Sequence, residues 1–343
     1  MEKLQLNQIG QLVKLPRSLI HEEPTHTSRY LIMANILSML GNPKDMKILD
    51  VGGKKGLLRK FPGFTPTIID IEDSDEPDFV KGSALSMPFK DGQFDYSISC
   101  DVLEHIPHAD REKFVNEMLR VSNKGIIICA PFNSGTNELL ETEMNNYYHQ
   151  LTGLQHRWLR EHIDNGLPSE QEVESLLRKQ KINFVKFRHF SAICWREIVK
   201  QHLLHSAFSD NKLLEESVYK TYENYYKNMC NVDFSEDGYR TFFWISKVSK
   251  PEVELPKNAA VNEAKEKFLV ENKDVLLNLL ENEMKNLRVM QHKSLEADII
   301  KQENVALVAE LREIKSSKSW HAIQKINTAR SKINSATSFG KKD

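Results

Sequence analysis

The chain has little cysteine and no excess of either charge. Four cysteines occur among 343 residues, without a Cys-x-x-Cys pair, and this favours a reducing compartment over a disulfide framework. Lysine and arginine total 47 against 48 acidic residues, so no overall field draws the chain to nucleic acid or to an anionic membrane. No run of eighteen apolar residues occurs, and the first twenty residues lack an apolar stretch of signal-peptide length. We therefore expect a cytoplasmic protein that does not bind nucleic acid.

Several motifs of particular enzyme classes are also missing. The histidines show no His-Glu-x-x-His or other tight ligand spacing, so we expect no metal site. The glycine-rich segment reads GGKKG and does not satisfy Gly-x-Gly-x-x-Gly, which argues against a dinucleotide oxidoreductase. The Asn-Pro-Pro-Tyr and Asp-Pro-Pro-Tyr runs of amino-group-methylating nucleic-acid enzymes are absent as well.

Short apolar runs alternate with helix-like segments from residue 47 to residue 132. This alternation predicts an α/β fold with a doubly wound, mostly parallel sheet. The expected strands are 47–51, 67–71, 79–81, 94–99 and 125–130, followed by 182–190 and 239–248. Between residues 28 and 179 the expected helices are 28–40, 56–61, 101–105, 110–121 and 169–179.

The same patterns divide the chain into five parts. Residues 1–46 form a helical lead-in and residues 47–250 the main domain, in which 133–168 is expected to be an acceptor loop and 190–235 a helical insertion. Residues 251–262 bear prolines and polar residues and are interpreted as a linker. Residues 263–316 and 317–343 are interpreted as a coiled-coil helix and a basic amphipathic tail.

Apolar residues in the carboxyl-terminal helix follow two heptad frames with a break near residues 291–294. The first frame holds Val270, Leu277, Leu280, Met284 and Leu287, and the second holds Ala297, Ile300, Leu307, Leu311 and Ile314. This pattern favours a homo-oligomeric coiled coil, and the alternative is a solvated helix that packs on the main domain. From Lys315 to Asp343 seven basic residues face one acid, which is compatible with contact of the tail with a membrane surface, with a docking helix or with a frayed end.

A glycine-rich turn follows the first strand of the main domain. Asp50 lies at the end of that strand, and Gly52, Gly53 and Gly56 follow it directly. Glycines allow a tight turn and bring backbone N–H groups close to a ligand. Asp70 ends the next strand, where a carboxylate can accept both hydroxyl groups of a ribose. Two acids at the ends of adjacent strands indicate a nucleoside site.

These residues belong to a longer block with a recognisable pattern. The segments ILDVGGKKG, TIIDI, GSALSMPFKDGQFDYSISCDVLEHIP and GIIICAPF resemble the motifs of class I S-adenosylmethionine-dependent methyltransferases, in the branch that modifies small molecules and sugars. The resemblance implies a Rossmann-like sheet with an antiparallel last strand and S-adenosylmethionine as the cofactor. Lys54 stands where the family pattern has a glycine, and Ser83 where it often has an acid.

The resemblance also assigns residues to parts of the cofactor. It places the three glycines near the methionyl and ribose portions, with Asp50 behind them and Asp70 on the ribose. The remaining assignments are Ile71, Ser83 and Ala84 at the adenosine, and Cys100 and Asp101 beside the methyl group.

The acceptor side is expected to contain histidines. His105, with Glu104 beside it, follows the fourth strand and is our candidate general base for a hydroxyl acceptor. His156 and His162 lie in a segment that resembles the acceptor side of related enzymes, with Trp158 between them to stack on a sugar. The alternatives are that Glu104 and His105 only cap a short helix and that Trp158 packs into the core.

These features predict O-methylation of a small or glycan-linked acceptor, with cell-surface polysaccharide biosynthesis as the context. The alternative hypothesis is a catalytically inactive cofactor-binding domain that serves as a scaffold through its coiled coil, and the replacements at Lys54 and Ser83 favour it.

Overall fold

The structure is a computed structural model that describes residues 2–316, 321, 324–325 and 327–328. The chain divides into two units, residues 1–279 and residues 280–343. The first unit contains both sheets and all helices except the larger part of the long final helix. The second unit consists of the rest of that helix and the residues after it.

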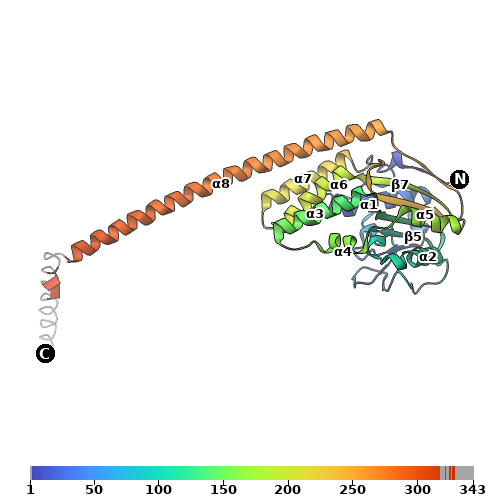
Figure 1. The fold of residues 1–343 in the computed structure, drawn as a ribbon, viewed down its shortest axis with the longest axis horizontal. Helices are drawn as coiled ribbons and strands as arrows, with labels where there is room; N and C mark the ends of the chain where they lie inside the picture. The colour runs from blue at the N-terminus through green and yellow to red at the C-terminus, as the bar shows by residue number, and fades with distance from the viewer. Residues whose placement is uncertain (1, 317–320, 322–323, 326, 329–343) are drawn as a thin grey trace, which may run out of the picture. The chain divides into compact units, whose positions relative to one another are not determined.

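A seven-stranded sheet is the centre of the first unit (Figure 1). Its strand order is β4-β3-β2-β5-β6-β8-β7, and only β8 runs antiparallel to its neighbours β6 and β7. The strands are β2 (Ile48–Val51), β3 (Thr67–Asp70), β4 (Phe79–Lys81), β5 (Phe94–Cys100), β6 (Ser122–Pro131), β7 (Asn183–Ser191) and β8 (Gly238–Ser246). The predicted α/β fold with an antiparallel last strand is therefore confirmed.

Side chains that alternate along the central strands fill two separate cores. Ile127 and Cys129 of β6 pack on one face of the sheet, and Ile126 and Ile128 pack on the other. Such strands are buried on both sides, which explains their nearly continuous apolar sequence. Helices α1 (Pro24–Leu40), α3 (Thr136–Thr152), α6 (Ala192–Ala207) and α7 (Lys212–Asn228) cover the first face, and α2 (Arg111–Val121) and α5 (Glu170–Lys179) cover the second.

The predicted loop over 133–168 is wrong, because this segment contains two helices. They are α3, which packs against α6, and α4 (Arg157–Asn165), which follows it. Gly153 ends α3 with φ 75° and Gly166 ends α4 with φ 68°, conformations that favour glycine. The many polar residues of this segment hid the helical period, since α3 buries polar side chains such as Asn137 and Glu141.

The predicted linker over 251–262 is also partly wrong. Strand β9 (Pro251–Glu254) pairs in parallel with β1 (Glu2–Gln5) in a separate two-stranded sheet. A proline is tolerated at the first residue of an edge strand. The partner strand β1 is almost 250 residues away in the sequence, so the residues around β9 alone do not indicate that it pairs. Helix α8 (Asn258–Ser316) then begins inside the expected linker.

The remaining differences from the predicted elements concern the start of α1 and several short 3-10 helices. Helix α1 begins at Pro24, four residues earlier than expected, because proline fits the first turn of a helix. The helices expected at 56–61 and 101–105 are shorter 3-10 helices, η4 (Leu57–Lys60) and η5 (Leu103–His105). The remaining 3-10 turns are η1 (Leu6–Gln8), η2 (Arg17–Leu19), η3 (Pro43–Asp45) and η6 (His108–Asp110). The expected helical insertion over 190–235 corresponds to α6 and α7.

Helix α8 belongs to both units. In the first unit its residues Val261 and Phe268 are buried, and the side chain of Asn224 on α7 donates a hydrogen bond to the carbonyl of Phe268 at 3.1 Å. This part of the helix therefore packs on the main domain. In the second unit Leu280, Leu287 and Leu307 are each more than half exposed in the single chain. The predicted tail, 317–343, lies almost entirely outside the described residues.

None of the helices in the described part of the chain is both long enough and apolar enough to cross a bilayer.

Candidate active site

The end of β2 and the turn after it form a closely packed loop. Gly52 adopts φ 81°, and a Cβ atom there would lie 2.3 Å from Val102. A Cβ atom on Gly53 would lie 2.3 Å from the carboxylate of Asp50. Gly56 has φ 59°. The loop thus requires glycine at these positions, as the sequence predicted for a turn that approaches a ligand closely.

Asp50 is fully buried beneath this loop. Its Oδ1 accepts a hydrogen bond from the Tyr30 hydroxyl at 3.3 Å, and its Oδ2 has no partner among the described residues. Burial raises the pKa of the Asp50 carboxyl to about 7. An unpartnered buried carboxylate oxygen behind the loop fits a ligand that brings a hydrogen-bond donor or a positive charge, as the methionyl portion of S-adenosylmethionine does.

Lys54 takes no unusual backbone conformation in the loop, because its φ is not positive. Its ammonium pairs with Glu72. The positive charge that a lysine brings to this turn is therefore balanced by a carboxylate of the loop after β3.

Asp70 ends β3 next to the glycine loop. It is half-buried, its Oδ1 accepts a hydrogen bond from the backbone N–H of Glu72 at 2.9 Å, and partial burial raises its pKa. Ile71, immediately after it, is 69% exposed and so offers an apolar surface beside that carboxylate. The exposed hydroxyl of Ser83 accepts a hydrogen bond from the N–H of Leu85, which shapes the turn that also contains Ala84.

Asp101 lies at the end of β5, directly after the buried Cys100, and joins three elements. It adopts φ 51°. Its carboxylate pairs with Arg29 of α1 and with Arg240 of β8, and the Nη2–Oδ2 distance to Arg240 is 2.5 Å. The structure thus gives this carboxylate two protein partners, and neither arginine had a signal in the sequence.

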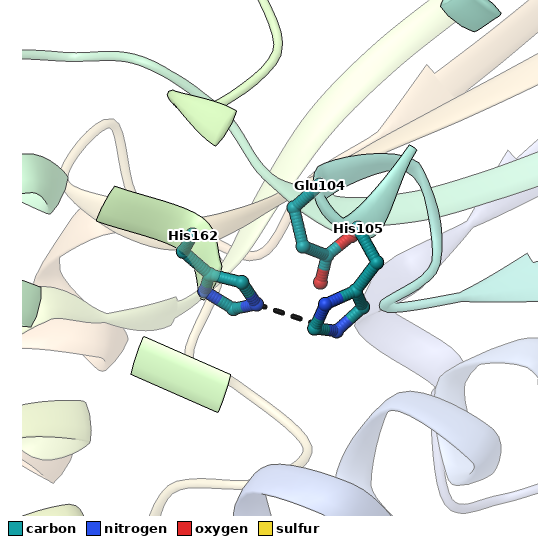
Figure 2. A group of neighbouring side chains, drawn as sticks. All are labelled: Glu104, His105 and His162. Carbon is teal, nitrogen blue, oxygen red and sulfur yellow. Dashed lines mark hydrogen bonds between the residues drawn. The ribbon is translucent and has the colours of Figure 1, made fainter. Parts of the chain in front are cut away.

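Two histidines and a glutamate meet just beyond this junction (Figure 2). Nε2 of His105 on η5 lies 3.3 Å from Nε2 of His162 on α4. A carboxylate oxygen of Glu104 and one ring nitrogen each of His105 and His162 lie within 4.8 Å of one another. Glu104 is fully buried, and neither of its carboxylate oxygens has a hydrogen-bond partner among the described residues. We call Glu104, His105 and His162 the histidine cluster.

Two further carboxylates flank the imidazoles of the histidine cluster. Nδ1 of His162 is 3.0 Å from Glu141 of α3, which also accepts a hydrogen bond from the Tyr239 hydroxyl at 2.5 Å. Nδ1 of His105 is 3.4 Å from a carboxylate oxygen of Glu161. Glu141 and Tyr239 are far from the cluster in sequence, and no local motif marked them.

The surroundings of the histidine cluster shift the pKa values of its two histidines in opposite directions. Burial, followed by the neighbouring His162, lowers the pKa of His105 to about 4. Burial alone would lower the pKa of His162, but the hydrogen bond to Glu141 and nearby carboxylates raise it above its usual value. Burial raises the pKa of Glu104. At neutral pH the imidazole of His105 is therefore neutral.

Trp158 and His156 lie on either side of the start of α4. The Trp158 indole is 41% exposed and meets the His105 ring edge to face at 5.3 Å. His156 packs edge-on against Tyr148, and among the described residues it has no hydrogen bond to the histidine cluster. The structure thus brings together His105, Glu104 and His162 of the four predicted catalytic residues, with His156 beside them.

A parallel sheet with a glycine loop after its first strand and an acid after its second defines a nucleoside-binding α/β domain. Residues 68–129 match the family model described as "Methyltransferase domain". Over this segment the chain is similar to a methyltransferase domain, in agreement with the S-adenosylmethionine motifs noted in its sequence.

Curated relatives match a short segment of the chain. Norajmaline N-methyltransferase of Rauvolfia serpentina is 45% identical over 47 residues, which are 14% of this chain and 15% of that protein. A protein of Oryza sativa subsp. japonica assigned as a chloroplastic tocopherol O-methyltransferase is 46% identical over 52 residues, 15% of this chain and 14% of that protein. The match thus spans about a seventh of these relatives, and it includes enzymes named for nitrogen and for oxygen acceptors.

Solved structures of low sequence identity align with a larger part of the chain. The magnesium protoporphyrin IX methyltransferase of Synechocystis PCC 6803, solved with bound SAH, is 12% identical, with 68% of this chain and 88% of that chain covered and a TM-score of 0.39. The YcgJ protein of Bacillus subtilis is 14% identical, with 65% and 100% covered and a TM-score of 0.39.

Proposed function

We propose that the chain transfers a methyl group from S-adenosylmethionine to a hydroxyl oxygen of a small or glycan-linked acceptor. The observation that carries this proposal is the histidine cluster at the carboxyl end of β5. A hydroxyl group must lose its proton to become a good nucleophile, whereas a neutral amine can attack before it does so. A neutral imidazole and a buried carboxylate beside the cofactor edge of the sheet supply groups that can take such a proton.

When bound, S-adenosylmethionine supplies an electrophilic methyl group on a positively charged sulfur. The protein's part is to align the acceptor and to exclude water. Asp70 is suited to hold the ribose, and the loop at Gly52 and Gly53 to approach the methionyl portion. The exposed ring of Trp158 beside His105 suits the apolar face of a sugar, which supports a saccharide acceptor. A role in polysaccharide biosynthesis is part of this proposal.

The proposal is tested with the full-length chain, methyl-labelled S-adenosylmethionine and a panel of glycosides. Each glycoside is paired with its deoxy and amino analogues at one position. We expect label in the hydroxyl compound, none in the deoxy compound, and a turnover about 10²-fold lower in His105→Gln, with unchanged cofactor affinity. Labelling of amino analogues alone would contradict the proposal.

The competing scaffold hypothesis has less support than the sequence suggested. It rested on the replacements at Lys54 and Ser83, and the charge of Lys54 is paired with Glu72. Isothermal titration with S-adenosylmethionine together with the glycoside panel separates the two hypotheses, since a catalytically inactive cofactor-binding domain would release heat of binding but transfer no methyl group.

We also propose that the chain self-associates through the second-unit part of α8. Apolar side chains there are about half exposed or more in the single chain: Leu280, Leu287, Leu295, Ile300 and Leu307. A coiled coil would bury such a series. Contact of the basic tail with a membrane surface and a cytoplasmic location are further proposals, the latter supported by four free, buried cysteines.

A further inference from the structure

The two facing imidazoles of the histidine cluster have the spacing of ligands on one metal ion. Two nitrogen ligands about 2.0–2.1 Å from a tetrahedral ion lie roughly 3.3–3.4 Å apart. The Nε2 atoms of His105 and His162 are 3.3 Å apart, which is long for a hydrogen bond between ring nitrogens. We propose that Glu104, His105 and His162 bind a divalent metal ion of the zinc or manganese type.

Binding of a metal ion by Glu104 would explain why its carboxylate is buried without a partner. Glu104 is fully buried with both carboxylate oxygens unpartnered among the described residues, and no arginine or lysine there forms an ion pair with it. The guanidinium groups of Arg29 and Arg240, which act on Glu104 electrostatically, are paired with Asp101. An isolated buried carboxylate is strongly unfavourable unless a cation compensates it. A dication between Glu104 and the two imidazoles provides that compensation.

His162 has the outer partner that metal-binding histidines usually have. A ligand histidine commonly directs its second ring nitrogen to a carboxylate, which fixes the ring and its tautomer. Nδ1 of His162 lies 3.0 Å from Glu141 in a hydrogen bond, whereas Nδ1 of His105 lies 3.4 Å from Glu161, within ion-pair distance but without a hydrogen bond among the described residues. The Nε2 atoms of the two rings face each other beside Glu104 (Figure 2).

The chemistry of the ligands indicates which ion fits. Two imidazoles with one carboxylate suit zinc, manganese or iron better than magnesium or calcium, which prefer oxygen ligands. Three protein ligands leave a coordination position open, as in catalytic rather than structural sites. The expectation of no metal site rested on spacing, and no standard ligand spacing joins His105 to His162, which lies 57 residues later on a different element.

With Nε2 of His105 on the ion, the ion would activate the acceptor hydroxyl in place of His105 as a base, and the inference rests on the proposed function only in this step. An acceptor hydroxyl at the open position would have a lowered pKa. The O–H proton would leave to solvent, a C–O bond would form with the methyl carbon, and the C–S bond would break to leave a neutral thioether. Metal binding itself requires neither acceptor nor cofactor.

The test is equilibrium dialysis of the chelator-stripped full-length chain against Zn²⁺, with bound metal measured by mass spectrometry. We expect one Zn²⁺ per chain, and binding at least 100-fold weaker in Glu104→Gln and in His162→Gln. Glu141→Gln should weaken binding about 10- to 100-fold through its effect on His162. The matched control is His108→Gln, since His108 is an exposed histidine three residues from His105 and should leave Zn²⁺ affinity unchanged.

Folding and cofactor binding of each variant are measured independently of its metal binding. Circular dichroism and S-adenosylmethionine affinity should be unchanged in every variant, and His105→Gln replaces any variant that does not fold. Mn²⁺ binding followed by paramagnetic resonance should show the same order of variants. Wild-type chain that binds no stoichiometric Zn²⁺, or Glu104→Gln and His162→Gln that bind it as wild type does, would overturn the metal site. The glycoside panel decides on O-methylation independently of this result.

Discussion

Asp70 is the residue whose contribution to cofactor binding is the easiest to isolate. Its half-buried carboxylate ends β3 beside the glycine loop. We expect Asp70→Ala to weaken S-adenosylmethionine binding roughly 10- to 100-fold, since hydrogen bonds to a charged group contribute about 1.5–3 kcal/mol. Isothermal titration measures this. Asp73→Ala is the control, because Asp73 is an exposed acid whose one ion pair within the described part of the chain is with Lys81. Equal affinity of both variants would remove Asp70 from the site.

Asp233 makes the stability of the fold depend on pH. It is fully buried, its Oδ2 accepts a hydrogen bond from the N–H of Ser191 at 2.9 Å, and burial raises its pKa to about 6. A carboxyl whose pKa is raised in the folded state stabilises that state below its unfolded pKa, about 3.9, and this contribution is lost as the pH rises through 6.

We therefore expect Asp233→Asn, which keeps a neutral side chain of the same shape, to abolish this part of the pH dependence. The stability difference between variant and wild type should shift in favour of the variant by about 2–3 kcal/mol between pH 4 and pH 7. Urea unfolding at several pH values measures it. A difference that is constant with pH would show that Asp233 does not change its protonation in this range.

At the scale of elements, the Asp101 junction connects α1, β5 and β8. Its two arginines are largely buried, with exposed side-chain fractions of 11% for Arg29 and 6% for Arg240. We expect Asp101→Asn to destabilise the fold by about 3–5 kcal/mol, because removal of one partner leaves buried charges uncompensated. Asparagine tolerates the positive φ of this position, so backbone strain is not the cause.

Thermal unfolding monitored by circular dichroism measures the effect of Asp101→Asn. Asp91→Asn is the matched control, because Asp91 also pairs with an arginine but its side chain is 82% exposed. Surface ion pairs of this kind contribute about 0–1 kcal/mol. If both variants melted at the same temperature as wild type, Asp101 would not hold the three elements together.

The sequence predicted most strands of the large sheet because their information is local. The runs at 48–51 and 94–100 are buried and rich in apolar residues, and Gly52 and Gly56 of the loop have positive φ. The β1–β9 pair and the partners of Asp101 depend on residues from distant parts of the chain. Arg29, Arg240 and Glu141 carry no sequence pattern, so only the folded arrangement could reveal them.

At the scale of the whole molecule, the boundary between the units predicts where the chain can be shortened. A truncation after Leu279 keeps the buried residues Val261 and Phe268 of α8 on the main domain. We expect this truncated chain to unfold at the wild-type temperature, to bind S-adenosylmethionine and to have a lower oligomeric state. Light scattering measures the oligomeric state, differential scanning calorimetry the unfolding temperature and isothermal titration the binding. An unchanged number of chains per particle would contradict self-association through α8.

A truncation after Pro251 is the informative comparison. It removes most of β9 and exposes the surface that Phe268 covers, while Asn224 loses its hydrogen-bond acceptor. We expect a clearly lower unfolding temperature for this shorter chain, since loss of one large buried aromatic side chain alone costs about 3–5 kcal/mol. Equal stability of the two truncated chains would mean that the start of α8 does not contribute to the first unit.

The parallel pairing of β1 with β9 also bears on when the protein folds. Strand β1 is synthesised long before β9, and its pairing partner is missing until residues 251–254 have been made. The first unit can therefore be completed only after nearly all of it has been synthesised. Synthesis of the exposed part of α8 begins after that point. A nascent chain thus closes its own domain before it presents the helix through which chains would associate, which limits pairing between unfinished copies.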